Sequence, residues 1–134
     1  SDDLMALKSE NISIRLVKGA YREEKSIAFI SMNEIRDNFL KLADILLSYQ
    51  SGQDALATHD EAILNSILSN DGSKKIAFEF LFGVRRDLQK KLNTKHTVGI
   101  YLPYGNDWLP YTMRRLSEWK NIKFIAKSLI KEKL

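Results

Sequence analysis

Short apolar segments of extended type alternate with amphipathic helical segments four times along the chain, and this alternation constrains the fold most. Strands that are joined through helices run parallel, because a tight hairpin cannot connect parallel neighbours. The segments expected to be strands are residues 12–19, 54–59, 76–83 and 96–103. The sequence therefore predicts an α/β fold built on a parallel sheet.

The helical segments carry recognisable start signals. Ser31 and Glu34 form a capping box ahead of the first, and Asp60 can cap the second from residue 61. A short helix is expected after the third strand, over residues 85–93. Asp107 can cap a helix over residues 108–119, and residues 120–134 are expected to form an amphipathic C-terminal helix. We interpret residues 1–134 as a single unit.

Two architectures fit four βα units: an open doubly wound sheet, or part of a (βα)8 barrel. On the third strand, Phe78 and Phe80 point to one face, whereas Glu79 and Leu81 point to the other. A mixed, partly polar face suits a barrel interior that holds a ligand. A full barrel takes about 250 residues. The 134-residue chain is therefore expected to form half of one.

Composition narrows the function classes. The chain has no cysteine, which removes disulfide and thiolate chemistry, and its two histidines are too far apart in sequence to suggest a zinc site. The net charge of +4 suits anionic partners. The lysines are scattered and are not interleaved with exposed aromatics, so we expect no nucleic-acid binding.

Arg15 stands in the middle of the first expected strand, among apolar residues. Side chains alternate between the faces of a strand, so Arg15 shares its face with Ser13 and Val17. If both faces are covered, Arg15 points into the interior, where an unpaired charge is costly. Two interpretations remain open: a structural ion pair with an acid such as Glu79, or a cation that serves a ligand cavity.

Polar and small residues follow the first two strands. Lys18, Gly19 and Ala20 make a turn whose backbone can approach anionic oxygens. Thr58 and His59 end the second strand, at the rim where barrel enzymes collect their active-site groups. A structural histidine held by hydrogen bonds is the alternative for His59.

The helix expected over residues 108–119 carries a potential carboxylate fork. Tyr111, Arg114 or Arg115, and Glu118 are spaced three to four residues apart and so share one helix face. Two guanidinium groups can hold one carboxylate from two sides, with Glu118 orienting an arginine. The alternative is a solvated arginine–glutamate pair on a surface helix.

Three segments together carry a resemblance to a known family. "IRLVKGAY", "ATHD" and "IYLPYGNDWLPYTMRRLSE" resemble, in order and spacing, the carboxy-terminal half of flavin-dependent proline dehydrogenases, over residues 12–119. The resemblance implies a distorted (βα)8 barrel that binds FAD. It also implies oxidation of L-proline to Δ1-pyrroline-5-carboxylate by hydride transfer to the flavin, with electrons passed to a membrane quinone.

The resemblance also assigns roles position by position. It places Arg15 beside the reactive edge of the flavin, as a catalytic and cofactor-binding residue. The other implied FAD contacts are Lys18, Gly19, Ala20, Thr58 and His59. The implied substrate-binding residues are Arg114, Arg115, Tyr101, Tyr111, Leu81 and Glu118.

One strand departs from the family pattern. Residues 77–83 read "AFEFLFG", where members of the family more often read like "EFQMLYG". An acid is therefore lost at Ala77, and an amide is replaced by Glu79. Two interpretations remain open for Glu79: an ion pair with Arg15 that changes flavin electronics, or a mark of relaxed function.

The resemblance covers half a barrel, so we expect the chain to associate with a second half-barrel or with the missing N-terminal half. The alternative function is a catalytically silent half-barrel that binds flavin or a small carboxylate. We expect a cytoplasmic protein with peripheral contact at the inner membrane, on the matrix side in a eukaryote. The basic tail over residues 122–134 is a candidate for that contact, although a helix covering the barrel is the more ordinary interpretation.

Overall fold

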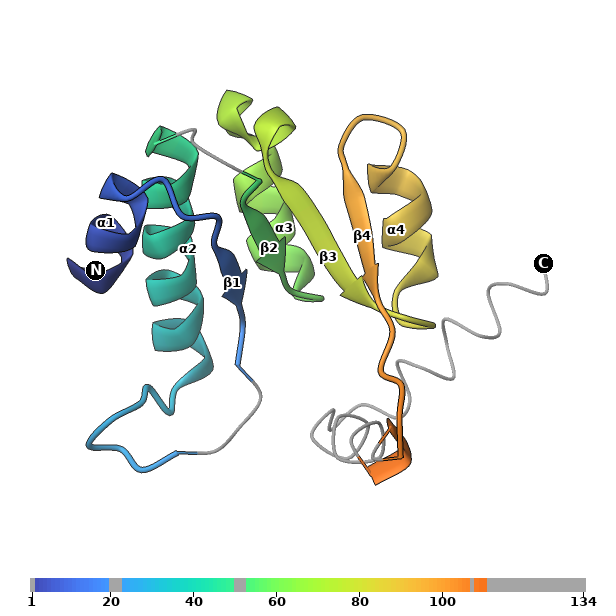
Figure 1. Cartoon of the computed structure of the whole chain (residues 1–134), viewed down its shortest axis with the longest axis horizontal. Coiled ribbons are helices and arrows are strands. Elements are labelled where there is room, and N and C mark those ends of the chain that lie inside the picture. The colour runs from blue at the N-terminus through green and yellow to red at the C-terminus, as the bar shows by residue number, and fades with distance from the viewer. Residues whose placement is uncertain (1, 20–22, 50–52, 107, 111–134) are drawn as a thin grey trace.

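A four-stranded parallel sheet, in the order β1-β2-β3-β4, organises the computed structural model (Figure 1). The structure describes residues 2–19, 23–49, 53–106 and 108–110. The strands are β1 (Arg15–Val17), β2 (Ala55–Ala57), β3 (Ala77–Leu81) and β4 (Val98–Tyr101). Each lies inside a predicted strand segment but is shorter than predicted, and the predicted α/β class is confirmed.

Helices alternate with the strands as expected. They are α1 (Asp2–Ser9), α2 (Met32–Tyr49), α3 (Glu61–Leu68), the 3-10 helix η1 (Asp71–Lys75) and α4 (Arg86–Leu92). Residues 108–110 are also helical. The remainder of the helix predicted over residues 108–119, and the C-terminal helix predicted over residues 120–134, lie outside the described residues. Helix α1 has no counterpart among the predicted elements.

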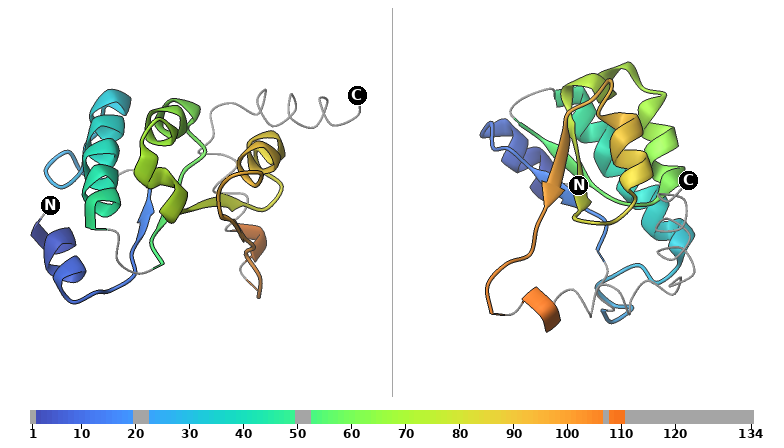
Figure 2. Two further views of the ribbon diagram at one scale, coloured as in Figure 1. Left: turned by 90° about the horizontal axis from the view of Figure 1, so that it is seen from above. Right: turned by 90° about the vertical axis from the view of Figure 1, so that its right-hand side faces the viewer.

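The strand order decides between the two architectures. Right-handed crossovers between strands that follow one another in sequential order place every helix on the same face of the sheet. A doubly wound sheet needs a reversal of strand order to cover both faces, and the described strands have none. Viewed from above, α2, α3 and α4 lie side by side along one face (Figure 2). The arrangement is that of half a (βα)8 barrel.

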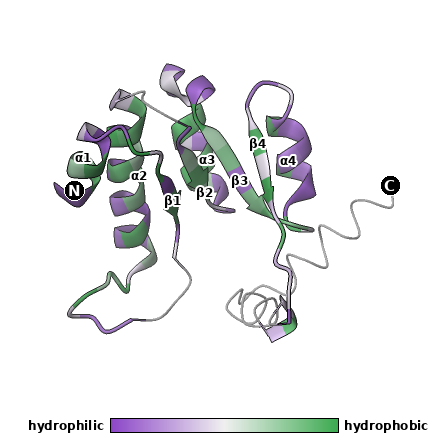
Figure 3. Cartoon of the chain, viewed as in Figure 1, coloured by the Kyte–Doolittle hydropathy of each residue, from purple (hydrophilic) through white to green (hydrophobic). Residues whose placement is uncertain are grey.

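The core lies between that helical layer and the sheet. Phe78 and Phe80 on β3 and Leu56 on β2 are 0–1% exposed and pack against the helices. Hydrophobic residues concentrate on the strands and on the sides of α2 and α3 that face them (Figure 3). The buried helix residues include Leu46, Ile63 and Leu64. Fully burying one such side chain contributes about 1.5–3 kcal/mol, so packing in this layer stabilises the fold.

Two of the three predicted helix caps are present, and the third, Asp107, lies outside the described residues. The N–H of Glu34 donates to Oγ of Ser31 at 3.4 Å, and the N–H of Ser31 donates to the Glu34 carboxylate at 3.3 Å. Oδ1 of Asp60 accepts the N–H of Ala62 at 3.1 Å. Helices α2 and α3 therefore begin directly after the caps that the sequence indicated.

A buried ion pair ties α1 to the sheet. Nζ of Lys8 lies 2.7 Å from Oδ2 of Asp54, and the Lys8 side chain is 0% exposed. Oδ1 of Asp54 accepts the N–H of Ile14 at 2.8 Å, just before β1. One carboxylate thus fixes both the helix and the entry to the first strand.

Among the described helices, none has the length and apolar character needed to span a bilayer.

Candidate functional site

The face of the sheet opposite the helices carries the mixed residues that the sequence indicated. Strand register places Val17, Ala57, Glu79 and Gly99 in one row across the four strands. Arg15 begins the adjacent row, opposite Ala55 on β2. In the described part of the chain no helix covers this face (Figure 2). The uncovered face therefore presents several small residues next to the ion pair partners Arg15 and Glu79.

Arg15 is not enclosed by the described residues, contrary to the expectation for a strand covered on both faces. Its side chain is 54% exposed. Nε of Arg15 lies 2.6 Å from Oε2 of Glu79, and Nη2 donates to Oε1 of Glu79 at 3.1 Å. The expected acidic partner is therefore present, and it holds the guanidinium through both of its oxygens.

The end of β1 meets the end of β2 through a shared carboxylate. Nζ of Lys18 donates to Oδ2 of Asp60 at 2.5 Å, and Nε of Arg36 donates to the same oxygen at 2.8 Å. Burial alone raises the pKa of Asp60, but the bonds from Arg36 and Lys18 outweigh burial and lower this pKa to about 2. Asp60 is therefore ionised at neutral pH. Two cations share its one charge, so this cluster of three side chains carries a net positive charge.

His59 connects β2 to β3. Its Nε2 accepts the backbone N–H of Leu81 at 3.0 Å, and its ring meets the edge of Phe80 at 5.6 Å between centroids. Burial, together with the charge of Arg85, lowers the pKa of His59 to about 4. His59 is therefore neutral at pH 7, with its proton on Nδ1. The hydrogen bond expected for a structural histidine is present, and the FAD contact predicted for His59 stays a prediction.

Neighbouring positions complete this rim. Thr58 is buried, and its Oγ1 accepts the N–H of Asp60 at 3.2 Å. Gly19 has open space where a Cβ would stand. Ala20, predicted to contact FAD beside it, lies outside the described residues.

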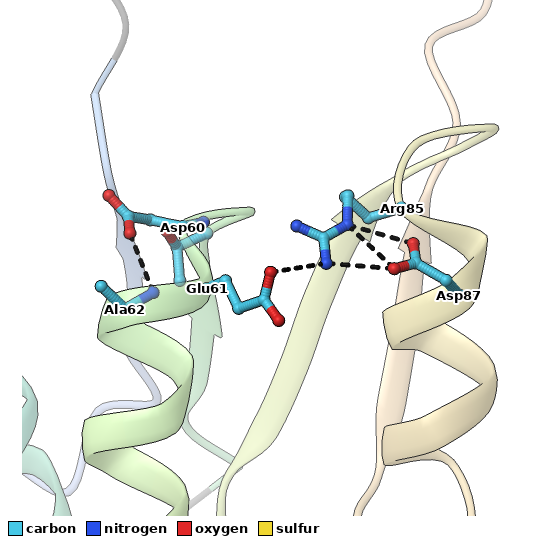
Figure 4. A network of polar contacts seen from close by, with 6 residues as sticks. Asp60, Glu61, Ala62, Arg85 and Asp87 are labelled. Atoms are coloured by element: carbon cyan, nitrogen blue, oxygen red, sulfur yellow. Dashed lines mark hydrogen bonds and ion pairs between the residues drawn. The ribbon is translucent and has the colours of Figure 1, made fainter. Parts of the chain in front are cut away.

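Arg85 organises the next part of the rim (Figure 4). Its guanidinium is held by Asp87 in two contacts, Nε to Oδ1 and Nη2 to Oδ2, each at 3.0 Å. Nη2 also donates to Oε2 of Glu61, at the start of α3, at 3.1 Å. Burial lowers the pKa of Arg85, but these carboxylates outweigh burial and raise it above its ordinary value. The side chain is 6% exposed, so Arg85 is a fixed charge beside His59.

Sequence reasoning did not single out Arg36, Arg85, Glu61 or Asp87. A local signal existed for one pair, because Arg85 and Asp87 are two residues apart at the start of a helix. The contact with Glu61 spans 24 residues and two βα units, so no local pattern announces it.

The predicted substrate residues are only partly described. Leu81 and Tyr101 are register partners at the ends of β3 and β4, so the structure brings these two together. Tyr101 is 41% exposed on the open side. The remaining residues of the predicted substrate site, including the carboxylate fork, lie outside the described residues: Tyr111, Arg114, Arg115 and Glu118. Within the described ranges, acidic and histidine side chains form no group suited to a metal ion.

Comparison with known proteins gives a consistent result. The sequence model of a family described as proline dehydrogenase matches residues 3–127. Proline dehydrogenase of Deinococcus radiodurans is 36% identical over 137 residues and aligns with 96% of this chain. Proline dehydrogenase 2 of Bacillus subtilis strain 168 is 35% identical over 140 residues and aligns with 97%.

The chain spans 44% and 45% of the lengths of these two relatives. That share agrees with a sheet of four parallel strands in place of eight. The family match covers most of the sequence, and the strand order fits half a barrel. The chain belongs to the proline dehydrogenase family.

Proposed function

We propose that this chain takes part in the FAD-dependent oxidation of L-proline to Δ1-pyrroline-5-carboxylate. It supplies strand ends that contact FAD and the arginines that bind the substrate carboxylate. The first four strands of the barrel come from a partner half. Electrons then pass to a quinone at the membrane, where the chain makes peripheral contact.

The observation that carries the proposal is the position of Arg15 on the open face of the sheet. Its side chain is half exposed and reaches Glu79 across β2, where the row of Glu79 carries the small residues Ala57 and Gly99 on either side. A flat, open floor next to a cation suits a planar, electron-rich ring. Lys18, which follows the same strand and is bonded to Asp60, adds a positive charge at the strand end that suits the anionic phosphates of the cofactor. The arginine on the open face and the lysine at the strand end therefore fit FAD.

In this scheme the chain's residues position the substrate and polarise the cofactor. FAD, when bound, supplies the two-electron acceptor for the hydride that leaves the proline ring. Arg15 stabilises negative charge at the ring. Arg114 and Arg115 hold the carboxylate, with Glu118 orienting them. Leu81, Tyr101 and Tyr111 pack around the substrate ring. Neutral His59 fixes the ends of β2 and β3 beneath the cofactor.

The partner half follows from the sheet edges. Neither β1 nor β4 has a second strand neighbour among the described residues. Unpaired backbone groups on such edges favour pairing with another chain. We take the occupant of these edges to be the strands that complete the barrel, because the chain spans 44% and 45% of the relatives it matches.

The test is to produce the chain together with the N-terminal half of the Deinococcus radiodurans relative. We expect the purified assembly to retain flavin absorbance, and L-proline to bleach it and reduce a dye acceptor. Arg15→Gln should lower kcat/KM by about 100-fold, the loss typical of one electrostatic donor in a catalytic site. Glu34→Gln is the control, because glutamine preserves the capping box.

Three outcomes separate the alternatives. Bleaching and dye reduction support the proposal. Bound flavin that L-proline does not bleach supports a silent half-barrel. An assembly without flavin and without turnover overturns the proposal. Replacing the dye with a short-chain quinone, and sedimenting the assembly with anionic liposomes, tests the acceptor and the membrane contact.

A further inference from the structure

Glu79 and Arg15 are joined across an intervening strand. Arg15 stands in the row of Ala55, whereas Glu79 stands in the next row, opposite Ala57. The ion pair therefore runs diagonally over β2, and only small side chains lie beneath it. Nη2 donates a hydrogen bond to Oε1 at 3.1 Å, and Nε lies 2.6 Å from Oε2, so a hydrogen bond and a close charge contact together hold the guanidinium in position.

Glu79 is the anchored member of the pair. Its side chain is 17% exposed, compared with 54% for Arg15. Gly99 makes room for it, since a Cβ at that position would stand 3.1 Å from Cγ of Glu79. Oε2 is buried, and no hydrogen-bond donor in the described part of the chain satisfies it. The positive charge of Arg15 compensates the buried negative charge of Glu79. We therefore expect the Glu79 side chain to keep this conformation.

We propose that Glu79 is a positioning residue that aims Arg15 at the flavin and offsets its charge. This inference rests on the proposed function of the open face. A cation beside the ring stabilises the reduced, negatively charged flavin more than the oxidised form. A carboxylate on that cation reduces this preference, because it adds a negative charge beside the same cation. Glu79 thus lowers the reduction potential of the bound cofactor.

The decisive measurement is the midpoint potential of the flavin in the assembly with Glu79→Gln. Glutamine keeps the shape and one acceptor oxygen but removes the charge. We expect affinity for reduced flavin, relative to oxidised flavin, to rise about tenfold, which corresponds to about 30 mV for a two-electron couple. Glu34→Gln removes one acid from the first turn of α2 and should leave the potential unchanged.

A second variant protects the test against misfolding. Gly99→Ala keeps every charge but forces Cγ of Glu79 to move from its seat. We expect a smaller rise in potential than with Glu79→Gln, because the carboxylate is displaced and not removed. Equal potentials in the wild type and both variants, with flavin bound in all three, overturn the inference and leave the proposed function standing.

The positioning role also has a readout that needs no cofactor. In the flavin-free chain, Glu79→Gln should speed hydrogen exchange of the Arg15 Nη2 hydrogens by about fivefold, since an uncharged acceptor binds Nη2 less strongly. Glu34→Gln should leave this exchange rate unchanged. Unchanged exchange in Glu79→Gln contradicts the positioning role. Absence of flavin from the wild type and all variants counts against the proposed function itself, and the redox part of this inference is lost with it.

Discussion

The backbone N–H of Leu81 donates a hydrogen bond to Nε2 of His59 at 3.0 Å, so a side chain at the end of β2 completes the backbone pairing at the end of β3. The bond requires an unprotonated Nε2. It therefore links the protonation state of one ring to the geometry of two strand ends.

His59 should make the chain less stable as the pH falls from about 6.5 to about 4. The unfolded histidine takes up a proton near its ordinary pKa, whereas the folded one does so only at about 4. The stabilisation is present above this window, and its loss amounts to at most about 3 kcal/mol.

Urea unfolding between pH 7 and pH 4.5, for the wild type and His59→Gln, checks this prediction. The variant should lose the pH dependence that histidine contributes, because glutamine does not titrate. Identical pH profiles for the two proteins would contradict it. NMR of the two histidine rings should also show His59 as the neutral Nδ1–H tautomer at pH 5.5.

Asp60 has two separable roles, as the cap of α3 and as the partner of Lys18 and Arg36. Asp60→Asn keeps a good cap but loses the charge, whereas Asp60→Ala loses both. We expect the alanine variant to be less stable than the asparagine variant by about 1 kcal/mol in chemical denaturation. Equal stability of the two would show that the cap contributes nothing.

Asp60 also predicts a pH effect at the acidic end. Its folded pKa is about 2, below the ordinary value, so its stabilisation is complete above the unfolded pKa near 4. It is lost as the pH falls from about 4 towards 2. Asp60→Asn should not show this loss. Denaturation curves of the wild type and the variant at pH 5 and pH 3, compared by their free energies of unfolding, would reveal the difference.

The Lys8–Asp54 pair should behave as one unit. Lys8→Met leaves the buried Asp54 charge without that partner and should destabilise the chain by about 3–5 kcal/mol. Asp54→Asn retains an oxygen for the N–H of Ile14. Lys8→Met combined with Asp54→Asn should therefore cost less than the sum of the single changes. Additive values in a double-mutant cycle would argue against coupling.

The open face should make the isolated chain associate. Val17, on edge strand β1, is 51% exposed. A lysine at this position should oppose edge-to-edge pairing, as inward-facing charges do on natural edge strands. Light scattering should show a mass above the monomer for the wild type and a lower mass for Val17→Lys. Ile27→Lys is the control, since it places the same change in a loop; a monomeric wild type would refute the prediction.

Much of the fold was predictable because strand periodicity is local. Alternation assigned Phe78 and Phe80 to the helical side and Glu79 to the other side, and burial agrees. Strand ends were less accurate, because pairing with a neighbour defines them. Helix α1 was missed because it is only eight residues long, and its anchor Lys8 pairs with a residue 46 positions away.

The candidate site was also predictable only where the signal is local. The Arg15–Glu79 pair was foreseeable, since both residues lie on the inward face of their strands. The Arg85 network was not, because Arg85 adopts a left-handed conformation, φ 51°, that few non-glycine residues adopt and that sequence does not signal for arginine. The carboxylate fork over residues 111–118 lies outside the described residues and stays a prediction.

The two faces of the sheet have different roles. Side chains turned towards the helices, such as Phe78 and Phe80, hold the scaffold, whereas those turned away, such as Glu79 and Gly99, contribute little to that packing. Substitutions on the second face can therefore accumulate over generations without unfolding the first. A scaffold of this design can change its chemistry one residue at a time while its shape is inherited intact.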